Sequence, residues 1–260
     1  MLFIVLVAFV VFFFGASIGS FVSASAHRMY KKETVVLGRS RCPKCGHKLG
    51  FFELFPVFSY VCLWGKCKKC KESIEVEELL IEIISGLIFF GAFFYRWAWS
   101  ADAESFSLVI IRDWILLGGL IFLFIYDFRY KIIPDKVSIP LIIILFVYNA
   151  LLGYEIYKLL LAIFIGGGFF LAQYLISKGK WVGDGDIRMG ALLGAGLGYP
   201  HIVLVLFLAY LMGGGYSVIL LAMKKVKLKT QIAFGTFLAI GGGIALFFGD
   251  KIIDWYLNLL

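Results

Sequence analysis

The stretch YDFRYKIIPD, residues 126–135, ends one apolar run and leads into the next. It carries Asp127 at the edge of a segment where a bilayer tolerates few acids, and an ionisable group in such a place is by default a candidate functional residue. A second aspartate in a similar place, Asp186, closes the sequence GDGD and precedes another apolar run. Each has an ordinary explanation, because Asp186 could be the N-cap of the next helix and Asp127 an interfacial residue at a helix end. Two carboxylates brought together could instead share one proton and activate water.

The composition is that of a protein that crosses a membrane several times. Hydrophobic residues make up 62% of the chain, and its mean hydropathy is +0.94. Because one span needs about 20 apolar residues, the sequence predicts an all-α membrane protein with about eight transmembrane helices. The third run is long enough to span a bilayer only if it includes Arg112 and Asp113, or if Asp127 lies inside the membrane. The sixth run is short and rich in glycine. The eight apolar runs begin near Leu2, Leu79, Trp114, Val137, Tyr157, Ile187, Ile202 and Ile232.

The positive charges give the chain an orientation. Of its 25 lysines and arginines, 21 lie in four segments, 27–78, 128–136, 178–188 and 224–229. The positive-inside rule places these segments in the cytoplasm and both termini outside. The net charge of +8 reflects this rule and an attraction to anionic membrane lipids, so no nucleic-acid partner is expected. The first helix is expected to be retained rather than cleaved, since cations follow it and none precedes it.

The segment 27–78 is long and polar, and it carries two Cys-x-x-Cys pairs with 21 residues between them. Four thiolates that converge from two tight turns can fill the closed tetrahedral shell of a structural zinc ion. A segment of this size can hardly build a core alone, so a metal would supply folding free energy. Two disulfides are the alternative, which a reducing cytoplasm disfavours. Cys62 is expected to be a packed thiol and His47 to face solvent, and the predicted ligands are Cys42, Cys45, Cys67 and Cys70.

Together these features resemble the type IV prepilin peptidases, the leader peptidase/N-methyltransferases within the GxGD type of intramembrane aspartic protease. The resemblance covers nearly the whole chain. It rests on GASIGSF (15–21) followed by Arg28, the two cysteine pairs, Asp127 with IPD (133–135), the GDGD stretch (183–186) and FGTFL (234–238). The chain departs from the family pattern with Leu54 for an asparagine, Glu78 and Leu79 for Tyr-Pro, Arg188 for a lysine and Thr236 for a proline.

The resemblance implies a domain organisation and a location. Residues 1–26 would be the first transmembrane helix, 27–78 a small cytoplasmic zinc-binding domain between helices one and two, and 79–260 the protease core. The protein would lie in the bacterial inner membrane among its lipids. Its substrates would be prepilins or pseudopilins, whose leader is removed on the cytoplasmic side and whose new N-terminal residue is methylated with S-adenosylmethionine.

The resemblance also implies roles for individual residues. Asp127 and Asp186 would be the catalytic pair, and Gly183 and Gly185 would permit the tight turn beside the second aspartate. The candidates for methyl transfer, by resemblance alone, are Glu53, Glu82 and Gly86, although Glu82 is as readily an ordinary acid at a helix interface. The departures at Leu54 and at 78–79 fall in the region that the family associates with methylation, so they bear on that activity and not on the protease.

Other interpretations remain open from the sequence. Two nearby aspartates are expected to be bystanders, Asp135 as the cap of the fourth helix and Asp184 as a residue that points to water. A presenilin-like or signal-peptide-peptidase-like protease shares the Tyr-Asp and GxGD pattern, but the cysteine pairs weigh against it. A proton-coupled transporter could use the two aspartates as a relay, but such folds usually show repeated halves, and no convincing repeat is present in the sequence.

Overall fold

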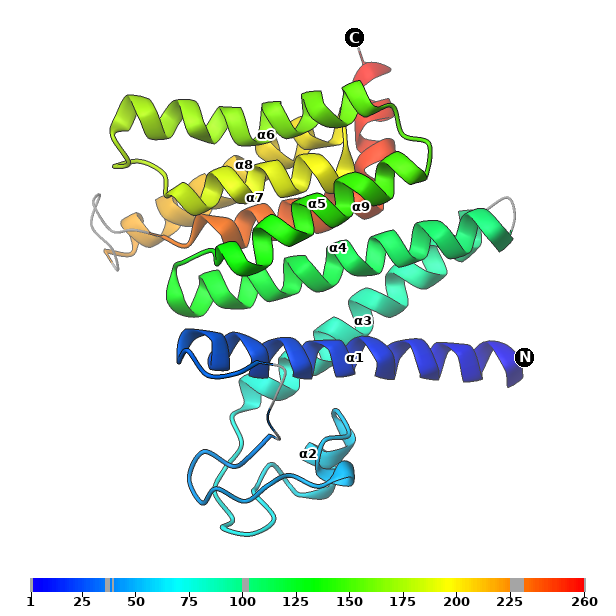
Figure 1. Cartoon of the computed structure of the whole chain (residues 1–260), viewed down its shortest axis with the longest axis vertical. Helices are drawn as coiled ribbons and strands as arrows, with labels where there is room; N and C mark the ends of the chain where they lie inside the picture. The colour runs from blue at the N-terminus through cyan, green and yellow to red at the C-terminus, as the bar shows by residue number, and fades with distance from the viewer. Residues whose placement is uncertain (1, 36–37, 39, 100–102, 225–231, 260) are drawn as a thin grey trace. The chain divides into compact units, whose positions relative to one another are not determined.

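The computed structural model describes residues 2–35, 38, 40–99, 103–224 and 232–259. The positive segment 224–229 therefore lies, beyond Lys224, outside the described residues. The chain divides into two compact units, Met1–Ala101 and Asp102–Leu260 (Figure 1). This division groups the first helix, the cysteine-bearing segment and the second long helix, whereas the three functional domains expected from the sequence stay a prediction.

The first unit is built on two long helices, α1 (Leu2–Tyr30) and α3 (Val76–Trp99). The connection between them carries the short helices η1 (Phe51–Glu53) and α2 (Phe58–Cys62). Glycines let α1 and α3 approach closely, since a Cβ at Gly19 would lie 2.5 Å from the hydroxyl oxygen of Ser85. Small residues at a helix–helix contact are typical of membrane proteins, in which close packing replaces the hydrophobic effect.

The second unit contains six helices among its described residues, and in Figure 1 α7 (Asp184–Leu197) lies between α6 (Ile156–Ser177) and α5 (Asp135–Leu151). Most of α7 is buried, and it packs backbone to backbone against α6, where Gly190 meets Gly166 and Gly194 meets Ala162. Side chains larger than hydrogen at these glycines would separate the two helices. The bounds are α4 Ala103–Tyr130, α5 Asp135–Leu151, α6 Ile156–Ser177, α7 Asp184–Leu197, α8 His201–Ala222 and α9 Phe234–Leu257.

The expectation of an all-α membrane protein is confirmed, since the described residues form helices and no strand. Among the described residues, eight helices of 14 or more residues follow the eight apolar runs, and six of them are long and apolar enough to cross a membrane. The sixth run is indeed short, because α7 has 14 residues. The third is not, because α4 has 28 residues and includes both Arg112 and Asp113. The short fourth helix, α5 with 17 residues, was not anticipated.

Candidate functional site

Asp127 lies in the last turn of α4 and is 5% exposed. Its carboxylate accepts a hydrogen bond from the backbone N–H of Thr236, at 3.0 Å, in the first turn of α9. Gly235 makes this approach possible, since a Cβ there would lie 2.8 Å from the same carboxylate oxygen. The free N–H groups of a helix N-terminus are a favourable place for an anion. Asp127 is therefore held against the start of a helix that is 109 residues further along the chain.

Asp186 lies in the first turn of α7 and is 8% exposed. It is not the N-cap, as its place in the sequence allowed, because Gly183 occupies that position. The Asp186 carboxylate reaches back instead and accepts the Gly183 N–H at 3.1 Å. This bond occupies a donor that a helix start otherwise leaves without an intrahelical partner. The carboxyl group is thereby fixed in direction as well as buried.

The two aspartates are near enough to interact electrostatically. The turn between α4 and α5 connects them, because Ile133 is buried between their two supporting glycines. A Cβ at Gly185 would lie 2.8 Å from Cβ of Ile133, and one at Gly235 would lie 3.0 Å from its Cδ1. Helices α4, α7 and α9 therefore meet around one isoleucine, and two carboxyl groups lie beside it.

Arg188 ties the first turn of α7 to the α4–α5 turn. Its guanidinium forms ion pairs with Asp135 at 2.8 Å and with Asp184 at 3.2 Å. The expected cap role of Asp135 is wrong, since Pro134 is the N-cap of α5 and Asp135 is the first helical residue. Asp184 is exposed, as expected, but it is also paired. Both bystander acids thus share one cation, whereas Asp127 and Asp186 are held by backbone N–H groups.

The four predicted cysteines come together in the first unit. Their four Sγ atoms all lie within 4.8 Å of one another. The Sγ atoms of Cys42 and Cys70 are 3.8 Å apart, and those of Cys45 and Cys67 are 4.0 Å apart. These separations are far from a disulfide bond of about 2.05 Å. They match the roughly 3.8 Å edge of a tetrahedron whose centre lies about 2.3 Å from each sulfur, the Zn–S distance.

The local backbone favours thiolates at two of the four cysteines, whereas burial and the neighbouring thiols raise the pKa of Cys70 to about 12. Hydrogen bonds from the backbone N–H groups of Cys45 and Lys44 lower the pKa of Cys42 to about 7, and similar bonds from Cys70 and Lys69 lower the pKa of Cys67. Metal binding requires deprotonated thiols, so the donor set fits a metal ion.

Two further residues of this segment differ from expectation. His47 pairs with Glu53 at 3.1 Å instead of facing solvent, and Cys62 is exposed rather than packed. Neither difference changes the set of four sulfurs, since His47 is engaged with a carboxylate and Cys62 lies in α2.

Comparison with known proteins decides the family. Residues 13–97 match the bacterial peptidase A24 N-terminal domain, and residues 114–218 match the type IV leader peptidase family. A prepilin leader peptidase/N-methyltransferase of Stutzerimonas stutzeri is 30% identical over 228 residues, which cover 85% of this chain and 76% of the relative. The chain belongs to the type IV leader peptidase family. Similar relatives with the same name occur in Pseudomonas aeruginosa (29% identical; 94% of this chain, 91% of the relative) and Aeromonas salmonicida (27%; 96% and 94%). No solved structure matches the chain significantly.

The residues that this family resemblance suggests for methyl transfer lie in the first unit, each with partners of its own. Glu53 accepts the Gly50 N–H at 2.8 Å, beside its pairing with His47. Glu82 accepts the Val57 N–H at 2.7 Å. Gly86 gives α1 room, since a Cβ there would lie 2.7 Å from the ring of Phe12. Their role in methylation remains a proposal, and each has a structural reason to be present.

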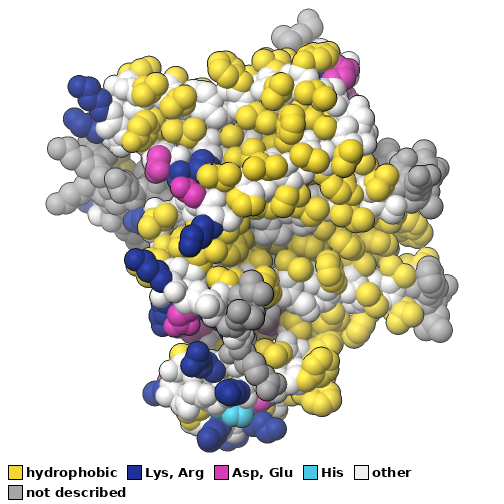
Figure 2. Space-filling view, in the orientation of Figure 1, with side chains coloured by type: hydrophobic (Ala, Val, Ile, Leu, Met, Phe, Trp, Pro, Cys, Tyr) yellow, Lys and Arg dark blue, Asp and Glu magenta, His cyan; other side chains and the backbone are white. Residues whose placement is uncertain are grey.

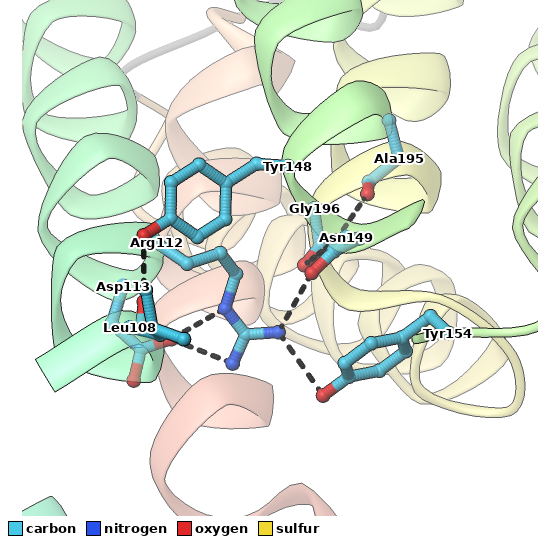
Figure 3. Close-up of polar contacts among 8 residues, drawn as sticks. All are labelled: Leu108, Arg112, Asp113, Tyr148, Asn149, Tyr154, Ala195 and Gly196. Atoms are coloured by element: carbon cyan, nitrogen blue, oxygen red, sulfur yellow. Dashed lines mark hydrogen bonds and ion pairs between the residues drawn. The ribbon is translucent and has the colours of Figure 1, made fainter. Parts of the chain in front are cut away.

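The second unit also contains a buried polar cluster around Arg112 (Figure 3). Arg112 is 3% exposed and holds Asp113, 1% exposed, through two contacts of 2.7 and 2.8 Å. Arg112 also donates to the side chain of Asn149, at 3.3 Å. Asn149 in turn donates to two backbone carbonyls near the C-terminal end of α7, those of Ala195 at 2.7 Å and Gly196 at 3.1 Å.

Proposed function

We propose that this protein is a membrane aspartic endopeptidase with Asp127 and Asp186 as its catalytic pair. It would remove the leader peptide of type IV prepilins or pseudopilins. The observation that carries the proposal is the meeting of two buried carboxyl groups, from α4 and α7, in a member of the type IV leader peptidase family. The same cleavage is what the names of the relatives describe.

The arrangement suits activation of water. Two carboxyl groups this close in a buried place cannot easily both ionise, so they share one proton and titrate as a unit. The ionised group takes a proton from the attacking water, and the protonated group polarises the scissile carbonyl. The backbone bonds from Thr236 and Gly183 each hold one carboxylate oxygen, Oδ2, and so fix the direction of each carboxyl group.

Conservative substitutions test this pair. Asp127→Asn and Asp186→Asn should each abolish cleavage of a purified prepilin in detergent, because the amide keeps the shape but cannot exchange the proton. The matched controls are Asp135→Asn and Asp184→Asn, which change exposed, arginine-paired carboxylates and should retain substantial cleavage. Normal cleavage by either variant of the proposed pair would exclude the mechanism.

We propose that Cys42, Cys45, Cys67 and Cys70 hold one structural zinc ion. The closed set of four sulfurs supports a structural rather than a catalytic site, since a catalytic zinc keeps an open position. The metal would stabilise the fold of the segment between α1 and α3, and no step of cleavage would pass through it. Elemental analysis of protein purified under reducing conditions should find one zinc per chain, and finding none would refute the assignment.

We also propose that the protein methylates the new N-terminus with S-adenosylmethionine, in line with the double name of its relatives. The cysteine-bearing segment, with both aspartates, would lie at the cytoplasmic face of the inner membrane, and both termini would lie outside. The cations close to each aspartate in sequence support this orientation, namely Arg129 and Lys131 for Asp127, and Lys178, Lys180 and Arg188 for Asp186.

A further inference from the structure

An apolar stretch interrupts the polar connection between α1 and α3. Residues 50–65, GFFELFPVFSYVCLWG, here called the aromatic insert, contain η1 and α2 and a single charged residue, Glu53. That carboxylate is satisfied at the edge of the insert by Gly50 and His47. The flanking parts of the connection are strongly basic, with Arg41, Lys44 and Lys48 before the insert and Lys66, Lys68, Lys69 and Lys71 after it.

The insert contacts α1 and α3 well inside their spans. The ring of Phe55 lies 5.0 Å from that of Phe13 on α1, centroid to centroid. Phe13 precedes Arg28, a cation in the last turn of α1, by 15 residues, or about 22 Å at 1.5 Å per residue. One leaflet of the hydrocarbon core is only about 15 Å thick. If α1 spans the bilayer, the ring of Phe55 therefore lies at the depth of the acyl chains.

A polar anchor holds the insert at this depth. Val57 has φ 61° and ψ −51°, a conformation that a β-branched residue rarely adopts, and the Phe58 N–H closes the tight turn on the Pro56 carbonyl. The Val57 N–H is thereby free to donate to Glu82 of α3, which also hydrogen-bonds Ser20 of α1. Ser20 lies eight residues before Arg28, about 12 Å along the helix.

The outward side of the insert is covered with apolar side chains. Phe52 is 80% exposed and Trp64 is 87% exposed, and Phe51, Phe58 and Val61 are exposed as well. In Figure 2 hydrophobic side chains cover the part of the first unit where α2 lies, and lysine and arginine gather on the rest of the connection. Soluble surfaces rarely expose so many large apolar groups together. Aromatic side chains beside a row of cations are typical of a segment that enters an anionic membrane surface.

We propose that the aromatic insert is a membrane insert: residues 50–65 reach into the hydrocarbon core from the side where α1 ends, with Phe55 near the middle of the bilayer, and their exposed aromatic side chains contact lipid acyl chains. Glu82 is then the residue that anchors the insert to the spanning helices. The inference depends on α1 and α3 crossing the membrane and not on the catalytic assignment, so it can fail or succeed independently of the proposed protease. The polar segment expected from the sequence would be soluble only on either side of the insert.

Photo-crosslinking tests the contact directly. The photoreactive amino acid p-benzoylphenylalanine is placed at Phe58 in the full chain, reconstituted in vesicles of phosphatidylethanolamine and phosphatidylglycerol. The matched controls carry it at Phe9, an exposed apolar residue of α1, and at Lys69 in the basic flank. We expect the yield of lipid adduct at position 58 to approach that at position 9 and to exceed that at position 69 at least tenfold. A yield equal to that at position 69 would overturn the proposal, and so would crosslinking to added prepilin in place of lipid.

A second measurement uses a thiol that the chain already carries. Cys62 is an exposed thiol inside the insert, and its modification can be followed by mass spectrometry of its peptide. In vesicles opened to both sides, a water-soluble maleimide should label it at least tenfold more slowly than a membrane-soluble maleimide. Equal rates would contradict insertion. Glu82→Ala should raise the rate with the water-soluble reagent severalfold, and an unchanged rate would refute the anchoring role.

Discussion

The buried pair of Arg112 and Asp113 gives the sharpest test of what stabilises the second unit. We consider the change Arg112→Met, which keeps much of the side-chain volume and removes the charge. In the unsubstituted protein the Arg112 guanidinium contacts Asp113 at 2.7 and 2.8 Å, and it also donates to Asn149 and to the hydroxyl of Tyr154. Its removal leaves the Asp113 carboxylate, 1% exposed, without the cation beside it.

The expected cost follows from this burial. Breaking a buried ion pair by removing one partner costs about 3–5 kcal/mol, mainly because the other charge stays buried without compensation. Replacing both partners by neutral groups costs much less. The variant Arg112→Met/Asp113→Asn should therefore recover about 1–3 of these 3–5 kcal/mol. It cannot recover all of it, because the bonds from Arg112 to Asn149 and Tyr154, worth about 1 kcal/mol each, are lost in both variants.

Thermal unfolding of the full-length protein in mild detergent measures both variants. With a change of about 2–4 °C per kcal/mol for a unit of this size, the single variant should unfold about 6–20 °C below wild type. The double variant should lie between them. A loss of 1 kcal/mol lowers the unfolding temperature by at least about 2 °C. A single variant that unfolds within about 2 °C of wild type would therefore refute the assigned role of the pair. A double variant as unstable as the single one would show that the charge of Asp113 is not the cause.

Two further outcomes separate the parts of the proposed enzyme. Gly235→Ala would place a Cβ 2.8 Å from the carboxylate oxygen of Asp127 and should slow cleavage about tenfold, the effect of roughly 1.4 kcal/mol on the barrier; Thr236→Ala adds no atom there and should cleave normally, so equal rates would argue against the contact. Cys→Ser changes at the four-sulfur cluster should impair methylation more than cleavage, because the catalytic pair is held by helix packing in the other unit. Mass spectrometry of the pilin N-terminus decides this, since cleaved but unmethylated product supports separate sites and uncleaved precursor supports a shared path for the substrate.

Structural features could be predicted from the sequence where they depend on a run of fixed length or on a fixed spacing of residues. Apolar runs long enough for a bilayer predicted the long helices, and the spacing of the cysteine pairs predicted the four-sulfur cluster. Helix lengths were less certain, because Arg112 and Asp113 read as a break in an apolar run and are in fact paired within α4. A hydropathy pattern registers the two charges but not the pairing that lets them be buried.

Hydrogen bonds donated by backbone N–H groups could not be predicted from the sequence. The bond from Thr236 to Asp127 is made by an N–H that every residue except proline carries, so only the three-dimensional structure reveals it. The same holds for the Val57 N–H and its acceptor, Glu82. Sequence reasoning could place the carboxylates at helix ends, but it could not say which backbone groups bind them.

The position of Asp186 illustrates why both kinds of information are needed. Helix α7, with 14 residues, is about 21 Å long, shorter than the roughly 30 Å hydrocarbon core, so bilayer thickness alone does not fix its depth. Its depth must come from its neighbours: Asn149 binds the carbonyls near one end, and Arg188 and Ile133 hold the other. Between these ends, glycines allow the backbones of α7 and α6 to touch, so no flexible side chain lies between the two helices. Asp186 therefore owes its position to rigid contacts along a whole helix, which suits a group that must meet a second carboxyl from α4 within a fraction of an ångström.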